Sequence, residues 1–406
     1  MAGIDDLNTP CYIYDKEELI KNLDGFKRAM ESAWEFGPVS MGISVKTAPI
    51  AGVLAVARTS GYLAEVVSDE EYELALMSGF NPGQVIFNGP IKSKAWMFFA
   101  FDSGAIVNVD SWRELRFAVE YAAEKRAPRL GIRVNFDLEA ACPGETCAGD
   151  EPARFGFCVE DGSLGRAIAL LRAAGIEPVG LHMHSSTESH STPVYRALCR
   201  EAVRLVSEYS LASLEYVDVG GGFYGGGANE GAYTAYANVI AEGLSPLAES
   251  GVRVILEPGG AVLATAGSLA GRVVDTKTVR GFRFVITELS KLDLNSTLFS
   301  RRSFKCEAYV SGQREVCSSQ TICGYTCMEM DRVVDVEGWP QLEEGDLILV
   351  RNAGAYAASF APGFFIKQMP SVYLRNSDGS YEALELRRSL EPPSTCCVGS
   401  NCLDDD

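Results

Sequence analysis

Lys46 and Glu65 are the first two side chains along the chain that could do chemistry together. Lys46 ends the apolar run VSMGISVK, and Glu65 lies in the next apolar run, YLAEVVS. A lysine held partly out of water has a lowered pKa and can form a Schiff base with a carbonyl compound, and Glu65 could be its counter-ion. The alternatives are a lysine that extends into solvent and an ordinary surface carboxylate.

Three glycines follow another apolar run in VDVGGGF, residues 217–223. The backbone N–H groups of Gly220, Gly221 and Gly222 can surround a phosphate because no side chain stands in the way. The run is not GxGxxG and no P-loop lysine follows it, so dinucleotides and nucleoside triphosphates are poor candidates. The alternative is a simple tight turn.

Glu257 and His184 add a charge and a ring to this set. Glu257 ends the run RVILEP, where a buried carboxylate needs a cationic partner, and a protonated pyridine nitrogen is one candidate. His184, on the same strand face as His182 in HMHSST, could place its ring over an aromatic cofactor; the alternative is a hydrogen-bonded core histidine. Together these groups indicate pyridoxal 5′-phosphate (PLP) as the cofactor. The chain has three histidines, too few for a His-rich metal site, so we expect no metal.

The composition limits the class of protein. The 406 residues are 47% hydrophobic and carry a formal net charge of −18, so nucleic acid is not an expected partner. No apolar run approaches the roughly 18 residues that a membrane span needs, and the N-terminus lacks the pattern of a signal peptide. We therefore expect no membrane association and a cytoplasmic location, where the twelve cysteines would be reduced thiols.

The residues above lie at the ends of regularly spaced candidate strands, whose ends also supply Asn88, Asp110 and Arg133. Eight short β-rich runs alternate with longer helical patterns, which predicts a parallel sheet. Eight such units in about 220 residues match a closed, TIM-like (β/α)8 barrel, in which functional groups collect at the C-terminal ends of the strands. An open doubly wound sheet is the alternative. The candidate strands span residues 39–46, 62–68, 84–89, 105–110, 129–135, 180–185, 216–221 and 253–258.

The pattern changes after about residue 270, where alternating apolar and polar residues predict a C-terminal antiparallel β domain. The segment PCYIYD near the N-terminus is also strand-like and is expected to join that domain. We therefore predict an N-terminal segment over residues 1–30 that joins the β domain, a barrel over 31–268 and the β domain over 269–385. Residues 386–406 are predicted to be a disordered, acidic, cysteine-containing tail.

Taken in chain order, these motifs resemble the fold-type III PLP-dependent decarboxylases, the diaminopimelate, ornithine and arginine decarboxylase group. The resemblance extends over residues 9–365. It implies a PLP-binding barrel with an attached β domain and a carboxy-lyase that acts at the α-carbon of an amino acid. The motifs that carry it are TPCYIYD, SVKTA, AEVVSDEEYELALMSGF, ARFGF, HMHSST, VDVGGGF, EPGG, RRSFKCEAY, GYTCMEMD and NAGAY.

The resemblance also implies roles for individual residues. Lys46 would form the Schiff base and pair with Glu65, His184 would stack on the cofactor ring, and Glu257 would face the pyridine nitrogen. Cys327 would reach the active site of the other subunit as a proton donor, which implies a homodimer with shared active sites. Other cofactor contacts would come from Thr187, Gly220, Gly221, Gly222 and Tyr356, and substrate contacts from Arg302, Met328, Glu329 and Tyr356.

Two departures from the family pattern concern the phosphate and the substrate. Gly260 stands where the family usually has an arginine, and Met328 stands where an acidic residue usually reads the far amine of the substrate. A carboxylated or conjugated amino acid is therefore the expected substrate, and Arg302 would contact its carboxylate. The alternative is meso-diaminopimelate, if Glu329 contacts the far amine in place of the missing acidic residue. Two other functions stay open, a PLP-dependent racemase and a non-catalytic homologue that acts by binding an active decarboxylase.

Overall fold

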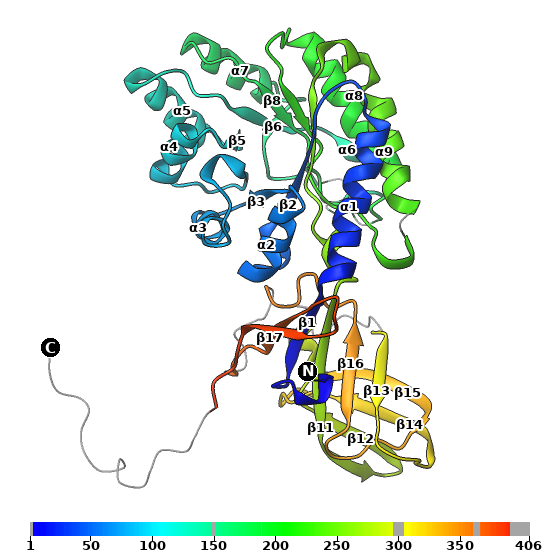
Figure 1. The fold of residues 1–406 in the computed structure, drawn as a ribbon. Coiled ribbons are helices and arrows are strands. Elements are labelled where there is room, and N and C mark those ends of the chain that lie inside the picture. The colour runs from blue at the N-terminus through cyan, green and yellow to red at the C-terminus, as the bar shows by residue number, and fades with distance from the viewer. Residues whose placement is uncertain are drawn as a thin grey trace, which may run out of the picture.

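The computed structural model describes residues 3–147, 149, 151–187, 189–229, 231–294, 304–359 and 366–389. In Figure 1 a barrel of parallel strands surrounded by helices forms the upper part, and a second, mixed β-sheet forms the lower part. Within these residues, no helix combines the length and the hydrophobicity that crossing a bilayer requires.

Eight parallel strands form the barrel, and the pairing between β5 and β6 closes it. Around the ring the order is β5, β4, β3, β2, β10, β9, β8 and β6, while the short β7 extends β6 outside the ring. The predicted closed barrel is confirmed, and each of the eight predicted strands contains one barrel strand. The bounds are β2 (Val39–Ser44), β3 (Leu63–Val66), β4 (Val85–Phe87), β5 (Ile106–Val109), β6 (Gly131–Asn135), β7 (Phe157–Cys158), β8 (Gly180–His182), β9 (Tyr216–Asp218) and β10 (Arg253–Leu256).

Helices cover the outside of the barrel, and their first residues are fixed by side-chain caps. Ser68, Ser93 and Ser111 each accept a backbone N–H from the first turn of α3, α4 and α5 respectively, which fixes where these helices begin. The bounds are α1 (Lys16–Ala33), α2 (Ala51–Thr59), α3 (Asp69–Met77), α4 (Lys94–Ser103), α5 (Trp112–Glu124), α6 (Leu138–Ala141), α7 (Ser163–Ala173), α8 (Thr192–Glu208), α9 (Gly231–Leu244) and α10 (Gly260–Leu263). Short 3-10 turns are η1 (Ile4–Asp6), η2 (Val45–Thr47), η3 (Pro82–Gln84), η4 (Gly227–Asn229), η5 (Ser245–Ser250) and η6 (Lys291–Asp293).

The interior of the barrel has an apolar lower layer and a polar upper layer. The ring of Tyr216 fills the lower layer together with Ile86 and Ile255. Glycine is required opposite this ring, because a Cβ at Gly180 would lie 2.0 Å from the Tyr216 ring and one at Gly131 would lie 2.2 Å from its hydroxyl. The upper layer consists of buried polar side chains, namely Glu65, Asn88, Asn108, His182, Asp218 and Glu257.

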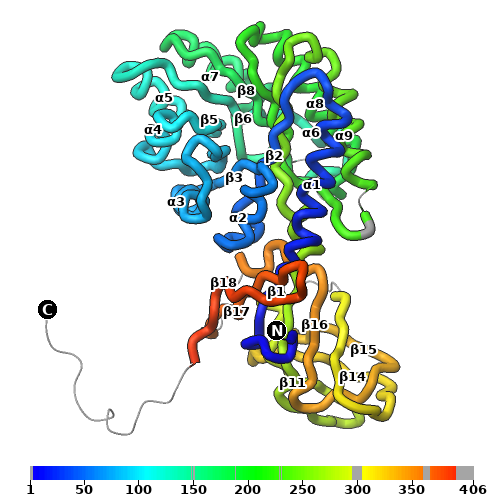
Figure 2. Tube along the Cα trace, viewed as in Figure 1, coloured from blue at the N-terminus to red at the C-terminus, as the bar shows by residue number. Residues whose placement is uncertain are grey.

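The second sheet combines strands from both ends of the chain. β1 runs antiparallel to β11 and parallel to β17, and Figure 2 shows the blue β1 close to the red β17 and β18. Most pairings in this domain are antiparallel, as predicted, whereas β1–β17 and β12–β14 are parallel. The bounds are β1 (Cys11–Asp15), β11 (Gly267–Val279), β12 (Phe282–Thr287), β13 (Cys306–Tyr309), β14 (Val316–Cys323), β15 (Arg332–Pro340), β16 (Leu347–Arg351), β17 (Ser371–Arg375) and β18 (Tyr381–Glu385).

The N-terminal segment belongs to both parts of the fold. β1 lies in the second sheet, and α1 then runs upward and packs against α9 and α10 of the barrel. The domain boundaries drawn from the sequence stay predictions. Residues 390–406 of the predicted tail, with Cys396, Cys397 and Cys402, lie outside the described residues.

A segment of the second domain returns to the mouth of the barrel and is packed closely against it. The backbone N–H of Gly354 donates to the carbonyl of Ala264, and that of Tyr356 donates to the carbonyl of Thr47 at 2.8 Å. A Cβ at Gly354 would lie 2.0 Å from the carbonyl oxygen of Leu263, so only glycine allows this approach. The contact brings Tyr356 beside the residue that follows Lys46.

A fully buried ion pair supports the loops after β4 and β5. Lys92 Nζ lies 2.8 Å from Oε2 of Glu114 and donates to the carbonyl of Gly89 at 2.7 Å. The same oxygen of Glu114 accepts the backbone N–H of Asp110. Burial lowers the pKa of Lys92 and raises the pKa of Glu114, so each group depends on the other to remain charged.

Replacing Lys92 with methionine is expected to destabilise the protein by about 3–5 kcal/mol, because Glu114 would then be a buried charge without its cationic partner. Denaturant unfolding of the Lys92→Met variant and the parent measures the difference. The double variant Lys92→Met/Glu114→Gln removes both charges and should regain most of the loss. Equal stability of the single variant and the parent would contradict the assigned role of the pair.

Candidate active site

A cavity of about 640 Å³ opens at the carboxyl ends of the barrel strands. The strand ends converge there, so residues that are distant in the sequence line one space. Among the lining residues are eight of those predicted from the sequence, namely Lys46, Glu65, His184, Thr187, Gly221, Gly222, Glu257 and Tyr356. Gly220 immediately precedes the two glycines in the lining.

Lys46 lies in the short turn η2 directly after β2, and Glu65 lies on the neighbouring strand β3. The register pairs Ser44 with Glu65, which places the carboxylate beside the residue two positions before Lys46. Lys46 Nζ lies 2.7 Å from Oε2 of Glu65, and the hydroxyl of Ser44 donates to the same oxygen at 2.7 Å. The predicted pair is therefore formed.

The proton of Lys46 is held more tightly than the sequence predicted. Burial on its own would lower the pKa of Lys46, but the charge and hydrogen bond of Glu65 and the charge of Glu257 outweigh it and raise that pKa above the ordinary value. The expectation of a lowered pKa is wrong, because it considered burial without the counter-ion.

Glu257 follows β10 and is 5% exposed, in the buried setting predicted for it. Its Oε1 accepts a hydrogen bond of 2.6 Å from Asn88, and its Oε2 lies 3.6 Å from Nε2 of His182. One ring nitrogen of His182 and one carboxyl oxygen from each of Asp218 and Glu257 lie within 4.8 Å of one another. The two carboxyl groups are therefore close enough to decide each other's protonation.

Asp218 carries the proton of this carboxyl pair, and Glu257 carries the charge. Burial, the charge of Glu257 and the hydrogen bond to it raise the pKa of Asp218 well above its ordinary value. Burial would also raise the pKa of Glu257, but His182, the hydrogen bond from Asp218 and His184 outweigh burial, so the pKa of Glu257 lies below its usual range. The result is one anion at the bottom of the cavity.

His182 and His184 stack with ring centroids 6.2 Å apart and an interplanar angle of 15°, so the shared face that the sequence predicted is formed. Burial, with the nearby Arg133 and His182, lowers the pKa of His184 to about 3, so its ring is neutral at physiological pH. Nδ1 of His184 accepts the backbone N–H of Gly221 at 3.2 Å. The ring is therefore fixed in orientation and can stack on another flat ring.

The three-glycine turn is fixed by hydrogen bonds within the protein. The N–H of Gly220 donates to Oδ1 of Asp218 and that of Gly221 donates to His184, so two of the three predicted phosphate donors already have partners. Outside the turn, Tyr195 donates to the carbonyl of Gly221, and His190 contacts the carbonyl of Gly222. A Cβ at Gly220 would lie 2.4 Å from that of His184, which explains the glycine there.

Of the predicted substrate residues that the structure describes, Tyr356 lines this cavity, whereas Met328 and Glu329 do not line it within one chain. Cys327, Met328 and Glu329 lie on the loop between β14 and β15, where Cys327 is exposed and Glu329 lies 3.6 Å from Arg332. Buried Asp331 organises this loop by accepting hydrogen bonds from Thr326 and Ser290. Arg302 lies outside the described residues.

The lining also includes residues to which the sequence assigned no role. Two of them, Asn88 and Arg133, were predicted only to be polar side chains at strand ends. Arg154 and Phe155 were predicted only as part of the ARFGF motif, and His190 was given no predicted role. The guanidinium of Arg154 lies 4.1 Å above the centre of the Phe155 ring. The signal that could have found Asn88 is its place directly after a buried strand, in phase with Glu65 one strand away.

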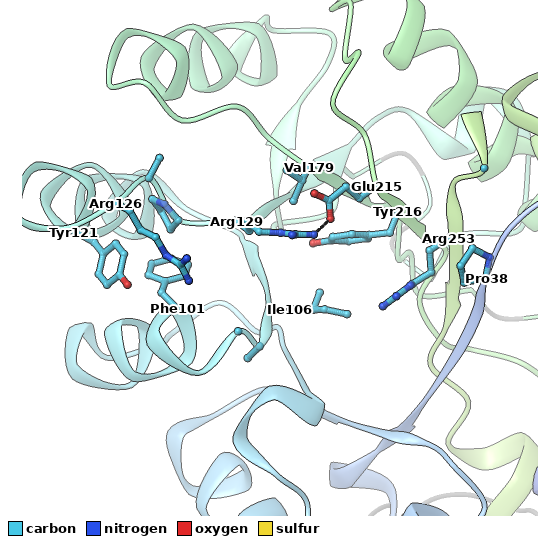
Figure 3. Close-up of a pocket in the computed structure, with 15 residues that line it drawn as sticks. Pro38, Phe101, Ile106, Tyr121, Arg126, Arg129, Val179, Glu215, Tyr216 and Arg253 are labelled. Atoms are coloured by element: carbon cyan, nitrogen blue, oxygen red, sulfur yellow. Dashed lines mark hydrogen bonds and ion pairs between the residues drawn. The ribbon is translucent and has the colours of Figure 1, made fainter. Parts of the chain in front are cut away.

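A second cavity, of about 580 Å³, lies at the opposite end of the barrel. Figure 3 shows Tyr216 and Ile106 at its centre, with Arg129 directed toward Glu215 and Arg253 approaching from the other side. Arg129 forms an ion pair with Glu215, and both side chains are largely exposed. Among the described residues, no carboxylate pair and no histidine line this cavity, so it differs chemically from the upper one.

Comparison with known proteins gives one consistent family. Residues 22–264, more than half of the chain, match the family described as pyridoxal-dependent decarboxylase, pyridoxal binding domain. A probable chloroplastic diaminopimelate decarboxylase of Oryza sativa subsp. japonica is 27% identical over 389 residues, which cover 94% of this chain and 78% of that protein. The diaminopimelate decarboxylase of Zymomonas mobilis is 25% identical over 394 residues, covering 94% and 91%.

Solved structures of similar fold are also decarboxylases. Diaminopimelate decarboxylase from M. jannaschii in complex with L-lysine has a TM-score of 0.82 at 22% identity and covers 94% of this chain and 90% of that one. The Helicobacter pylori enzyme complexed with L-lysine has a TM-score of 0.79 at 23% identity, covering 94% and 95%. At these identities the structural likeness shows the fold.

Replacing Glu65 with glutamine is expected to move the capture of PLP by the apoprotein to lower pH by at least about one unit. Capture needs the neutral amine of Lys46, and removing the carboxylate charge lowers the pKa of that amine. The rate at which absorbance at about 420 nm appears after PLP is added, measured across pH, checks this. Ser44→Ala keeps the charge and is the control. Coinciding profiles for Glu65→Gln and the parent would show that Glu65 does not hold the proton.

Proposed function

The chain belongs to the pyridoxal-dependent decarboxylases, and from this premise we propose how its own residues carry out the decarboxylation of an amino acid. The protein is a PLP-dependent carboxy-lyase. The observation that carries the proposed division of roles is that Lys46 with Glu65 and the buried Glu257 line the same cavity, with one amide between the two carboxylates. An amine and a separate anion in one cavity suit a flat cofactor with an aldehyde at one end and a ring nitrogen at the other.

The chemistry of the cavity lining fits PLP. Glu257 is a buried anion that lies 3.6 Å from Nε2 of His182, and a protonated ring nitrogen would supply a further opposite charge. The neutral, fixed ring of His184 suits stacking on the cofactor ring. The backbone at Gly222 is unobstructed by a side chain and lies at the rim of the same cavity, where a phosphate can approach.

Bound PLP supplies an electron sink for the electron pair left at the α-carbon when the carboxylate leaves as carbon dioxide. Lys46 would hold the cofactor through Nζ, and Glu65 would hold a proton at that nitrogen. Glu257 would favour the protonated form of the ring nitrogen. Thr187, Tyr356 and the backbone at Gly222 would hold the phosphate, since Gly220 and Gly221 donate within the protein, and there is open space at Gly260, where a Cβ would meet nothing within 4 Å.

The proposed substrate is an amino acid with a second carboxylate at its far end, a class that includes meso-diaminopimelate. Arg154 lines the cavity and has no ion-pair partner among the described residues, so it is available to a carboxylate. Met328 in place of an acidic residue argues against a simple far-end ammonium, and Arg302 and Glu329 remain proposed substrate residues. The diaminopimelate decarboxylases among the relatives support the same class by name.

Cys327 is proposed to protonate the α-carbon in the active site of a second copy, which makes the enzyme a homodimer with shared sites. Two features support this. The thiol is exposed on a loop that the buried Asp331 keeps in shape, and Met330 beside it is 50% exposed. A fixed loop that presents a thiol and an apolar side chain to the outside suits a contact between subunits.

We also propose a cytoplasmic location, which rests on the sequence alone.

The two other functions considered from the sequence are not favoured. The matched family and the similar proteins are decarboxylases, which argues against a racemase. A binding partner without activity would have no need for the Lys46–Glu65 pair or for a buried anion at Glu257, which costs folding free energy.

Purified protein with PLP is expected to release carbon dioxide from at least one amino acid in a panel that contains meso-diaminopimelate, other dicarboxylic amino acids, lysine and ornithine. Lys46→Ala should lose the absorbance at about 420 nm and at least about 1,000-fold in turnover, because the anchoring amine is gone. Optical rotation is followed in parallel. Loss of rotation without carbon dioxide would identify a racemase, and an unchanged absorbance in Lys46→Ala would remove Lys46 from its role.

Mixing the inactive variants Lys46→Ala and Cys327→Ala is expected to restore up to roughly a quarter of the parent activity, because half of randomly formed dimers are mixed and each contains one intact shared site. Carbon dioxide release after co-incubation measures the recovery. Each variant mixed with itself is the control. No recovery, with subunit exchange demonstrated by differently tagged chains, would mean that Cys327 does not act across a subunit boundary.

A further inference from the structure

Asn88 occupies an unusual position between the two acidic residues of the cavity. It follows β4 and is 3% exposed. Its Nδ2 lies 2.6 Å from Oε1 of Glu257 and 3.2 Å from Oε1 of Glu65. Glu65 lies on β3 and Glu257 follows β10, two strands that are not neighbours in the barrel, so a single amide nitrogen joins carboxylates from different parts of the ring.

The orientation of the Asn88 amide is determined by the groups below it. Nδ2 of Asn108 donates to Oδ1 of Asn88 at 2.9 Å, and the hydroxyl of Tyr216 donates to Oδ1 of Asn108 at 2.7 Å. In this direction every N–H and O–H points toward an acceptor. The reverse orientation of Asn88 would place its oxygen against two carboxylates, which is electrostatically unfavourable. The chain of donors therefore runs upward from Tyr216, whose ring also borders the lower cavity in Figure 3.

We propose that Asn88 is a positioning residue for the reaction, whose amide nitrogen holds Glu65 toward Lys46 and Glu257 toward the ring nitrogen of the cofactor at a fixed separation. This rests on the proposed roles of Lys46, Glu65 and Glu257. The side chain acts through the two carboxylates. Its two N–H hydrogens supply one donor to each anion, which lowers the repulsion between two buried negative charges that would otherwise face each other across the cavity.

The residue type fits this role better than its isosteres. Leucine has the same shape but no donor, so both carboxylates would lose a charge-assisted hydrogen bond. Aspartate would add a third buried carboxylate beside Glu65, Glu257 and the protonated Asp218. Asparagine alone among residues of this size offers two N–H hydrogens on one atom and an acceptor for Asn108.

Other charged and titratable groups surround the two carboxylates, and they contribute to the electrostatics of the cavity in every variant. Those near Glu257 are His182, His184, Asp218, Lys46, Arg133 and Tyr216, and those near Glu65 are Lys46, Glu71, Asp218 and Arg133. Ser44 also donates to Glu65, at 2.7 Å, and makes no hydrogen bond to Glu257. Ser44 is therefore a matched control that touches only one of the two carboxylates.

The test is a set of double-mutant cycles on the dissociation constant of PLP from the full-length protein, measured by titration at neutral pH. Asn88→Leu is expected to weaken PLP binding about tenfold, since a hydrogen bond to a charged group is lost on each side. In the Glu65→Gln background and again in the Glu257→Gln background, the effect of Asn88→Leu should fall to about threefold or less. Ser44→Ala should lose its effect only in the Glu65→Gln background.

A second readout separates positioning from mere support of the fold. Removing the N–H dipole raises the pKa of the amine nitrogen at Lys46, so the pH profile of the absorbance at about 420 nm should move upward by about half a unit or more in Asn88→Leu. Asn88→Ser, which keeps one donor, should give an intermediate shift and serves if the leucine variant does not fold.

The proposal is overturned if Asn88→Leu lowers only the unfolding temperature and leaves PLP affinity and the pH profile unchanged. It is also overturned if its effect on affinity is the same in the parent and in both glutamine backgrounds. Failure of the proposed function looks different, because then the parent would not bind PLP, or Glu257→Gln would bind it as the parent does, whatever residue 88 is.

Discussion

The buried anion at Glu257 is the constraint on which the upper half of the barrel depends. A carboxylate that is 5% exposed must be surrounded by donors or opposite charge, or it takes up a proton. The structure meets this requirement with the amide of Asn88, with His182 and with an adjacent Asp218 that keeps its own proton. These neighbours come from different strands of the barrel. The closed ring of strands is therefore what brings them together around the anion. The apolar layer around Tyr216 keeps water from reaching the anion from below.

Much of the barrel could be predicted from the sequence, because its information is local. Parallel strands buried on both faces give short apolar runs between helical patterns, and all eight were found in this way. The strands β14, β15 and β18 of the second sheet were not predicted individually. They have no regular alternation of burial: β14 is buried only at Gln320 and Ile322, β18 has no buried residue, and β15 contains Gly338 and ends at a proline. The parallel pairing of β1 with β17 joins the two ends of the chain, and no local pattern carries that information.

The candidate site also has a part that the sequence predicts and a part that it does not. Residue types at strand ends were sufficient to select Lys46, Glu65, His184 and Glu257, and the closed barrel brings them to one cavity. The raised pKa of Lys46 and the proton on Asp218 depend on distances to neighbours from other strands, so the sequence alone could not give them. Asn88 was visible as a polar strand end, but its bridging contact to two carboxylates is a property of the assembled ring.

The place of β1 in the second sheet has a consequence for how the chain is made. The register sets Cys11 beside Ala270 and Ser371, so β1 has its partners much later in the chain. At about 5–20 residues per second, it waits many seconds for them. During that time α1 can already dock on the nascent barrel while β1 stays an unpaired edge, which is the kind of segment that binds chaperones or other chains. The second sheet can therefore be completed only after the residues of β17 have been synthesised.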